Sequence, residues 1–559
     1  MTVAEYIVKI LADYSVSDVF GIPGGVVLPF LYAVKNSAAI QPHLLYNEQS
    51  AAFAALGYSQ KKKKLACAYA TRGPGIANMM TAIAEAYQES LPVVFITAHG
   101  KNNLPGMRMT YDQEIDFVPS VLKFTKYAAV IDSVEDVERV VEKAMQTALS
   151  ERFGPVLLDF SAKLFSQEIN QKYINLINAK SYQCSNAASC IMHLLQNSAR
   201  PIFLIGDGIK KSEKRAVARD RLKRLGIPVI SSRGAQDFMA ECDNYFGYIG
   251  SHGIRYANFI LAKADAVIVL GNRMSFPKDS KSFAPVLENK KIIRIDVDKT
   301  EFLKELPNVE NFCADAGAVV EALQTVDDMK NDKKKWLFVC NHLKKALTDC
   351  DLSEPCCFLM QVLSVMKNHE TTYVCDVGNN EFFFSRAYEK IHPKGEILYS
   401  KSFGTLGCAL GRAIGAWHAE NRPVVCIVGD QGFQYNIQEL QYIVQWKIPL
   451  KIAVMNNNAS GMIKDHEETM HKELFHVSEE NGYSVPDFRK VTEAYGMNFV
   501  KFDGNFELLN GCLQDADPCV IEYKYSDEIK LEPFLPKGNK CENLFPPLEE
   551  SFYNNLEIL

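Results

Sequence analysis

Residues 424–457 read VVCIVGDQGFQYNIQELQYIVQWKIPLKIAVMNN, and this stretch decides the fold. The apolar, β-branched run at 424–428 predicts a buried strand, and the run at 450–455 predicts a second one. Between them, a turn at Gly429-Asp430 leads into a stretch at 433–446 that predicts a helix. A strand, a helix and a second strand in this order predict a βαβ unit with parallel strands.

The same alternation of short apolar runs and amphipathic stretches continues along the whole chain in three blocks. It predicts an α/β fold of three consecutive doubly wound parallel-sheet domains, and we expect the first and third to share a topology. The predicted strands are 65–70, 92–97 and 155–160 in the first block, 201–205, 227–231, 266–270 and 291–296 in the second, and 372–376, 424–428, 450–455 and 519–523 in the third.

Polar, weakly periodic stretches near 165–185 and 325–352 are the predicted linkers between these blocks. The predicted domains are therefore 1–165, 185–330 and 350–530, followed by a proline-containing tail at 531–559.

Composition excludes several classes of protein. The 61 Lys and Arg are outnumbered by 67 Asp and Glu, which argues against a nucleic-acid partner. No apolar run approaches the roughly 20 residues that a membrane-spanning helix needs. The 15 cysteines are scattered without a C-x-x-C pair, which is typical of reduced core thiols. We therefore expect a cytoplasmic protein that acts without a membrane.

The turn Gly429-Asp430-Gln431-Gly432, with Asn456-Asn457 at the end of the next predicted strand, resembles the fingerprint of thiamine-diphosphate enzymes. The resemblance covers essentially the whole chain and, in its order of domains, is to the acetolactate synthase and 2-oxo acid decarboxylase superfamily. It implies thiamine diphosphate and Mg²⁺ as cofactors. Mg²⁺ prefers oxygen ligands, and the family pattern assigns them to Asp430, Asn457 and the backbone carbonyl of Ala459.

The third residue of the turn departs from the family pattern, because Gln431 stands where a glycine is usual. This puts the tightness of the turn in doubt, and we expect Gly432 to supply the missing backbone freedom. Three further segments resemble the family's cofactor contacts. They contribute Gly378, Asn379 and Asn380 after one strand, Gly404 and Leu406 in a loop that holds the cofactor bent, and Met462 after the second predicted metal ligand.

The N-terminal block carries the expected catalytic carboxylate. Glu48 opens an alanine-rich stretch, and in the family this glutamate bonds the pyrimidine ring and promotes loss of the reactive proton. The alternative is a charge on a solvated helix face, which the flanking alanines disfavour. The resemblance adds Gly25 to the catalytic residues, and Pro23 and Asn78 to the cofactor contacts. It also implies that Glu48 and Asp430 of one site come from different subunits, so we expect a homodimer or a dimer of dimers.

A second resemblance concerns the branch of the superfamily. The segment around Gln113 is similar to that of carboligases, in which a glutamine faces the reacting carbons, although it could also be a solvent-facing loop residue. No His-His pair occurs between Thr97 and Phe117, where simple pyruvate decarboxylases carry one. Both features favour a small 2-oxo acid as substrate and transfer of its two-carbon unit to a carbonyl acceptor.

The sequence does not identify the acceptor, because several residues differ from those usual in acetolactate synthases, among them Asn47, Arg72 and Asp112. The alternatives are pyruvate, 2-oxobutyrate or a keto-deoxysugar nucleotide. A simple decarboxylase, a flavin-using oxidase and an inactive homologue with a regulatory role are further readings. The pair His466 and His471 suggests a zinc hydrolase only weakly, because a spacing of five residues does not place two ligands on one helical face.

The central block resembles a domain that binds flavin in related enzymes. The positions that match are Arg273, Asp296 and Asp315, which makes FAD a possible third cofactor. Each of them could equally be an ordinary residue at a strand end or a helix cap.

Overall fold

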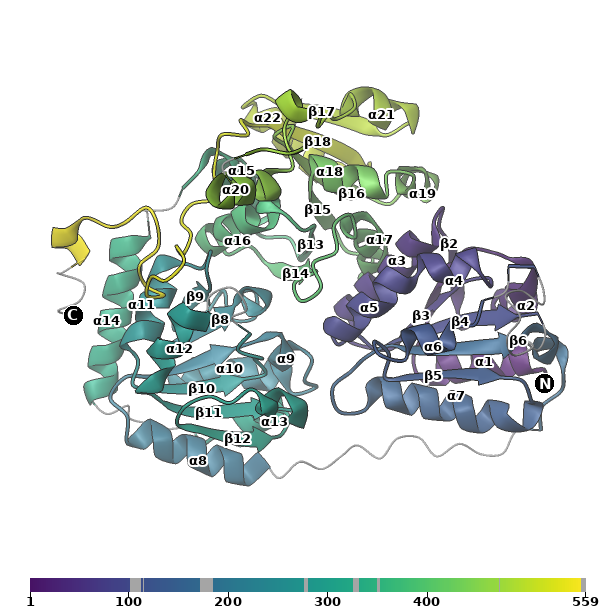
Figure 1. Cartoon of the computed structure of the whole chain (residues 1–559), viewed down its shortest axis with the longest axis horizontal. Coiled ribbons are helices and arrows are strands. Elements are labelled where there is room, and N and C mark those ends of the chain that lie inside the picture. The colour runs from purple at the N-terminus through teal and green to yellow at the C-terminus, as the bar shows by residue number, and fades with distance from the viewer. Residues whose placement is uncertain are drawn as a thin grey trace. The chain divides into compact units, whose positions relative to one another are not determined.

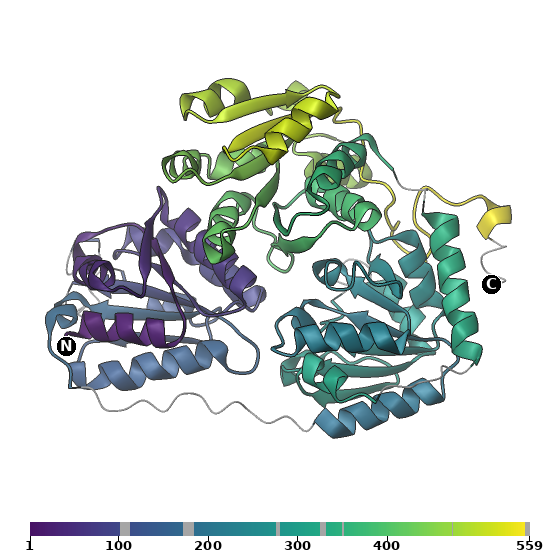
Figure 2. The ribbon, with the colours of Figure 1, turned by 180° about the vertical axis from the view of Figure 1, so that it is seen from behind.

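A computed structural model describes residues 1–100, 112–113, 115–170, 184–275, 280–324, 331–348, 352–471 and 473–553. It contains three six-stranded sheets whose paired strands are all parallel (Figure 1 and, from behind, Figure 2). The expectation of three α/β domains with parallel sheets is confirmed.

The first sheet has the strand order β2-β1-β3-β4-β6-β5. Its strands are β1 (Asp18–Gly21), β2 (Gln41–Leu44), β3 (Ala66–Tyr69), β4 (Val93–His99), β5 (Tyr127–Ile131) and β6 (Val156–Ser161). The helices of this part are α1 (Val3–Asp13), α2 (Leu28–Asn36), α3 (Glu48–Lys62), α4 (Pro74–Asn78), α5 (Met80–Gln88), α6 (Val118–Val121) and α7 (Val134–Leu149).

The central sheet has the order β12-β11-β10-β7-β8-β9, the arrangement of dinucleotide-binding folds. Side chains alternate between its faces, because Phe203 and Ile205 pack with one apolar cluster and Ile202 and Leu204 with another. Its strands are β7 (Pro201–Ile205), β8 (Val229–Ser232), β9 (Tyr245–Ile249), β10 (Ala266–Leu270), β11 (Lys291–Asp296) and β12 (Val309–Cys313). The helices are α8 (Cys184–Gln196), α9 (Asp207–Lys210), α10 (Arg215–Leu225), α11 (Arg255–Lys263), α12 (Ser280–Glu288), α13 (Ala316–Glu321) and α14 (Asn331–Leu347).

The third sheet has the order β14-β13-β15-β16-β18-β17, which is the order of the first sheet counted in chain sequence. The expected shared topology is therefore confirmed. Its strands are β13 (Thr371–Cys375), β14 (Gly395–Tyr399), β15 (Val424–Gly429), β16 (Leu450–Asn456), β17 (Asn498–Phe502) and β18 (Cys519–Lys524). The helices are α15 (Glu354–Met366), α16 (Asn379–Ile391), α17 (Ala409–Glu420), α18 (Asp430–Tyr435), α19 (Glu439–Gln445), α20 (Gly461–Met470), α21 (Phe488–Ala494) and α22 (Phe506–Gln514).

The chain forms two compact units. The first joins Met1–Ala179 with His369–Glu381 and Ile397–Asp527, and so holds the first and third sheets. The second joins Lys180–Asn368 with Phe382–Glu396 and Glu528–Leu559, and holds the central sheet. Helix α14 lies within the second predicted linker, and the domain boundaries themselves stay a prediction.

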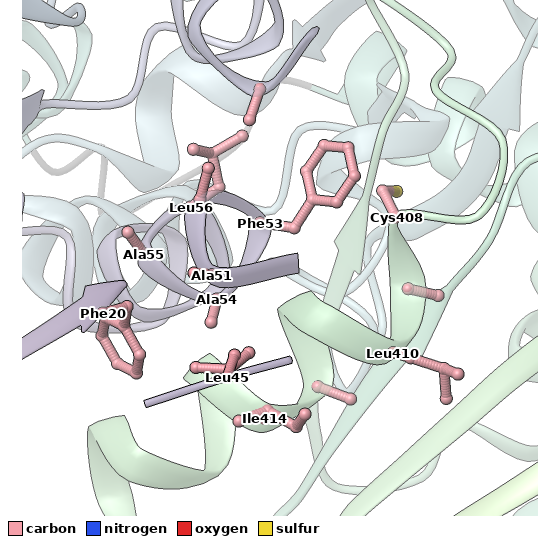
Figure 3. Packing of buried hydrophobic residues seen from close by; sticks show 14 of the residues in the cluster. Phe20, Leu45, Ala51, Phe53, Ala54, Ala55, Leu56, Cys408, Leu410 and Ile414 are labelled. Carbon is pink, nitrogen blue, oxygen red and sulfur yellow. The ribbon is translucent and has the colours of Figure 1, made fainter. Parts of the chain in front are cut away.

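Within the first unit, α3 and α17 pack with their backbones in contact. A Cβ added at Gly415 of α17 would lie 1.8 Å from the carbonyl oxygen of Ala54, and one at Gly57 of α3 would lie 2.2 Å from that of Arg412. Figure 3 shows small side chains of α3, such as Ala51 and Ala54, beside α17. The alanine-rich sequence of α3 therefore permits this close approach of the two helices.

We predict that Gly415→Ala lowers the free energy of unfolding by about 1–3 kcal/mol, because the added methyl group forces the two helices apart. Gly511→Ala is the matched control. Its Cβ would meet nothing within 4 Å, so it replaces a helical glycine at no steric cost and raises stability by up to about 1 kcal/mol. Urea unfolding of both variants checks this, and an unchanged midpoint for Gly415→Ala would contradict the close packing.

Candidate active site

Four segments of the third domain meet at the carboxyl ends of its central strands, and we call them the C-terminal half-site. They are residues 376–380 after β13, 402–408 before α17, 429–432 after β15 and 456–462 after β16. Strands β13, β15 and β16 are parallel neighbours, so their carboxyl ends lie along one edge of the sheet. Ligands of open α/β sheets bind at this edge.

Asp376 joins three of these segments. Its carboxylate is fully buried and accepts the backbone N–H of Gly407 at 2.9 Å, and a Cβ at Gly432 would lie 2.0 Å from its Oδ2 atom. The same Cβ position lies 3.5 Å from Leu406, so the predicted cofactor residues Leu406 and Gly432 are neighbours. Burial raises the pKa of Asp376 to about 7.

In the turn Gly429–Gly432, the reason for a glycine at position 432 is not the backbone freedom that we expected. Neither Gln431 nor Gly432 has a positive φ, so no extra backbone freedom is needed. Gly432 instead leaves room for Asp376, while the side chain of Gln431 accepts a hydrogen bond from Ser460 at 3.3 Å.

The expected single helix at 433–446 is also wrong, because the chain leaves the helical conformation at Asn436 between α18 and α19.

Asp430 is 2% exposed, and burial raises its pKa to about 6. Its Oδ1 atom accepts a hydrogen bond from the hydroxyl of Tyr483 at 2.8 Å. Its Oδ2 atom has no hydrogen-bond partner among the described residues. A buried carboxylate oxygen without a partner is costly unless a proton or a cation offsets its charge.

The other two expected metal ligands lie on the neighbouring segment. Asn457 follows β16 directly, and Ala459 is buried two residues later. The backbone N–H of Ala459 is among the groups that lower the pKa of Asp430, which places that residue beside the carboxylate. A Cβ at Gly461 would lie 2.8 Å from Nδ2 of Asn457 and 3.4 Å from Nδ2 of Asn379. The side chains of the predicted metal and diphosphate residues therefore converge here.

The remaining predicted contacts surround this cluster. Asn380 donates to the carbonyl of Asp376 at 2.9 Å, and its Oδ1 atom would lie 2.6 Å from a Cβ at Gly378, which has φ +137°. Gly404 has φ +73° in an exposed loop, and Met462 lies in the first turn of α20. The start of α16 at Asn379 adds backbone N–H groups of the kind that bind phosphate. An unpaired carboxylate oxygen, amide side chains and a helix start fit magnesium and a diphosphate.

The N-terminal domain gathers a second set of predicted residues, which we call the N-terminal half-site. Glu48 is the first residue of α3, and its Oε2 atom accepts from Nδ2 of Asn78 at 3.0 Å. A Cβ at Gly75 would lie 3.5 Å from the other carboxylate oxygen of Glu48. Glu48 is partly exposed, although Ala51 and Ala52 behind it are fully buried.

Gln113 also belongs to this half-site. A Cβ at Gly73, which has φ +62°, would lie 2.2 Å from the carbonyl oxygen of Gln113. Gln113 therefore borders the turn Gly73–Gly75, as Glu48 does. Gln113 is exposed. The exposed residues Pro23 and Gly25 complete the set, because a Cβ at Gly24 between them would lie 2.3 Å from Thr71 at the same turn.

Sequence reasoning missed the residues that connect the two half-sites. Ser50 donates to Oδ1 of Asn436 at 2.7 Å, and Nδ2 of Asn436 donates to the carbonyl of Gly407 at 2.7 Å. Glu439 is fully buried and accepts the backbone N–H of Tyr46 at 3.2 Å. Burial raises the pKa of Glu439 to about 7. Periodicity gave no signal for them, because the stretch 433–446 carries four glutamines as well, so Asn436 and Glu439 do not stand out as polar residues.

The three expected flavin positions have local roles in the structure. Asp315 caps α13 by accepting the N–H of Ala318 at 2.7 Å, and Asp296 accepts the N–H of Asp298 at 3.0 Å. Arg273 faces Glu301 with a 4.0 Å separation of their charged atoms. These contacts match the alternative of ordinary cap and strand-end residues, and a flavin site stays a prediction.

Three family models cover most of the chain. Residues 1–120 match "Thiamine pyrophosphate enzyme, N-terminal TPP binding domain", residues 188–323 match its "central domain", and residues 376–522 match its "C-terminal TPP binding domain". The chain belongs to the thiamine pyrophosphate enzyme family, as the motifs around Asp430 and Glu48 indicated.

Relatives that match almost the full length of the chain indicate which enzymes of this family it resembles. The acetolactate synthase large subunit of Porphyra purpurea is 30% identical over 96% of this chain and 92% of its own length. That of Lactococcus lactis subsp. lactis is 28% identical over 96% and 94%, and the probable acetolactate synthase large subunit of Methanocaldococcus jannaschii is 30% identical over 98% and 95%. The chain is therefore an acetolactate synthase-like, thiamine-diphosphate-dependent enzyme.

Among the described residues, none of the helices combines the length and the apolar character that crossing a membrane would require.

We predict that Tyr483→Phe weakens Mg²⁺ binding by about tenfold or more, because the Tyr483 hydroxyl holds the Asp430 carboxylate in one orientation. The Mg²⁺ concentration that gives half-maximal activity measures this effect. Tyr495→Phe, at the end of α21 in the same domain, is the control. Equal Mg²⁺ dependence of the Tyr483→Phe variant and the unaltered enzyme would show that this hydrogen bond does not orient a metal ligand.

Proposed function

We propose that the enzyme decarboxylates pyruvate or a similar small 2-oxo acid and joins the two-carbon unit to a carbonyl acceptor. The family, and relatives named acetolactate synthase along almost the whole chain, support this reaction type. The observation that carries the proposal is the joint presence of the Glu48 carboxylate, oriented by Asn78, and of a buried carboxylate oxygen of Asp430 that is free to bind a cation.

The roles of the chain's own residues follow from their positions. Thiamine diphosphate, when bound, would supply a cationic ring that takes up the electron pair left behind when carbon dioxide departs. Asp430, Asn457 and the Ala459 carbonyl hold Mg²⁺, and the start of α16 holds the diphosphate. Leu406, which lies beside Gly432, would contact the cofactor. Glu48, oriented by Asn78, would be the residue that exchanges a proton with the bound cofactor.

We also propose a homodimer or dimer of dimers in which each site combines half-sites of two subunits. Consecutive helical residues are turned by about 100°, so Glu48 and Ser50 point about 200° apart around α3. Ser50 faces Asn436 of its own chain, whereas the partly exposed Glu48 points away from it. This orientation supports a partner subunit as the source of the metal for each Glu48.

The acceptor is the open part of the proposal. Gln113 would orient the substrate or the acceptor, and its exposed position beside the turn that borders Glu48 supports this role. Pyruvate is the acceptor that the names of the relatives favour. The departures at Asn47, Arg72 and Asp112 keep a keto-deoxysugar nucleotide as the alternative. The scattered cysteines support a cytoplasmic location, because reducing compartments keep thiols free.

Product analysis tests the reaction directly. The purified enzyme is incubated with pyruvate, thiamine diphosphate and Mg²⁺, with and without candidate ketone acceptors, and the products are identified by mass spectrometry. We expect a product that contains the acceptor plus a two-carbon unit. Free acetaldehyde alone would indicate a simple decarboxylase, consumption of oxygen would indicate an oxidase, and no turnover of any 2-oxo acid would overturn the proposal.

We predict that Glu48→Gln lowers kcat by at least about 100-fold, because the amide cannot share a proton with the cofactor. Glu5→Gln is the matched control. Glu5 also lies in the first turn of a helix of the same domain, where glutamine serves equally well in the capping box with Thr2. Full activity of the Glu48→Gln variant would remove Glu48 from the chemistry.

A further inference from the structure

Two cysteines of the third domain, which no sequence motif links, are in contact. Cys512 lies in α22 and Cys519 is the first residue of β18. Their sulfur atoms are 2.6 Å apart. A separation of seven residues is no C-x-x-C motif, which is why the sequence indicated ordinary reduced thiols. The chain reverses direction between the helix and the strand, and this reversal brings the two sulfur atoms together.

The two thiols differ in accessibility. Cys519 is 3% exposed, and its backbone is held between two strands, opposite Lys451 of β16 and Asn498 of β17. Cys512 is only partly buried. The loop between them is also fixed, because the ammonium group of Lys451 donates to the carbonyl of Asp517. A small oxidant can therefore reach Cys512, while Cys519 stays in place behind it.

The electrostatic surroundings separate the two thiols further. The hydrogen bond with Cys519 and the positive charge of Lys451 lower the pKa of Cys512. The same hydrogen bond, together with burial, raises the pKa of Cys519. Burial alone raises the pKa of the fully buried Cys67, which behaves as an ordinary core thiol. Thiolates are the reactive form of cysteine, so Cys512 is the more nucleophilic member of the pair.

We propose that Cys512 and Cys519 form a peroxide-reactive dithiol, in which Cys512 is oxidised first and Cys519 then closes a disulfide. In the first step the Cys512 sulfur attacks hydrogen peroxide, a sulfur–oxygen bond forms, the oxygen–oxygen bond breaks and one water leaves. In the second step the Cys519 sulfur attacks that of Cys512, the sulfur–oxygen bond breaks and a second water leaves. The two thiols lose two protons and two electrons, which reduce one peroxide to two waters.

The disulfide would join α22 to the beginning of β18, at a distance from the candidate active site. Cys519 pairs with Lys451 at the start of β16, whereas the metal-binding segment follows Asn456 at its other end. We therefore expect oxidation to leave the activity unchanged and to raise the thermal unfolding midpoint, because the bond constrains the unfolded chain. The proposal does not depend on which reaction the enzyme catalyses.

Peptide mapping of the full-length protein tests the proposal. The native protein is treated with hydrogen peroxide, its free thiols are alkylated, and the digest is analysed by mass spectrometry without reduction. We expect one species that contains Cys512 and Cys519, is lighter than the dithiol by two hydrogens and disappears on treatment with dithiothreitol. Protein that is unfolded before oxidation shows whether the folded contact directs the pairing.

Variants identify the order of the two steps. Cys512→Ser should abolish the species, and Cys519→Ser should leave Cys512 as a sulfenic acid that a dimedone probe labels. Cys357→Ser, which removes an exposed cysteine elsewhere, should have no effect. Alkylation of both thiols after peroxide treatment, oxidation of Cys512 to sulfinic acid without a crosslink, or pairing only in the unfolded protein would each overturn the proposal.

Discussion

The contact between the backbones of α3 and α17 is the constraint on which the candidate site depends. Added side chains at Gly57, Gly411 or Gly415 would all overlap backbone atoms of the opposite helix. Glu48 begins one of these helices, and the loop with Gly404 and Leu406 leads into the other. The contact therefore fixes the start of the N-terminal half-site relative to the C-terminal half-site, and the bonds from Asn436 to Ser50 and Gly407 reinforce it. We propose that Glu48, which lies on the other side of α3 from Ser50, meets the C-terminal half-site of a second chain.

Most strands that the sequence predicted differ from the others in their place in the sheet, although the buried strands β1 and β9 do not follow this rule. The predicted strands occupy interior positions of the three sheets or positions next to the edge, where both faces are covered and the sequence is continuously apolar. The strands without a predicted apolar run include every edge strand, namely β2, β5, β9, β12, β14 and β17. An edge strand such as β12, with the sequence VENFC, has no such run, because much of its surface faces solvent.

The residues of the candidate site also fall into two groups, those that could be predicted from the sequence and those that could not. Groups whose chemistry is visible in their own residue type, such as the carboxylate of Asp430 at a strand end, could be predicted from the sequence. Groups whose role comes from a distant contact could not. Asn436 was assigned to a continuous helix, although it interrupts that helix to bond Ser50 of the other domain. Gly432 was expected to provide backbone flexibility, whereas the structure shows that a side chain at this position would collide with Asp376. Such contacts join residues that are far apart in sequence, so periodicity and motif spacing carry no signal for them.

The division of each site between two chains is tested most directly by mixing two inactive variants, Glu48→Gln and Asp430→Asn, through co-expression. If one chain supplies Glu48 and its partner supplies Asp430, each mixed dimer contains one intact site and one doubly altered site. Random mixing then gives roughly a quarter of the activity of the unaltered enzyme, although each variant alone is inactive. Absence of activity in a preparation shown by mass spectrometry to contain mixed dimers would mean that both groups come from the same chain, and would contradict the account.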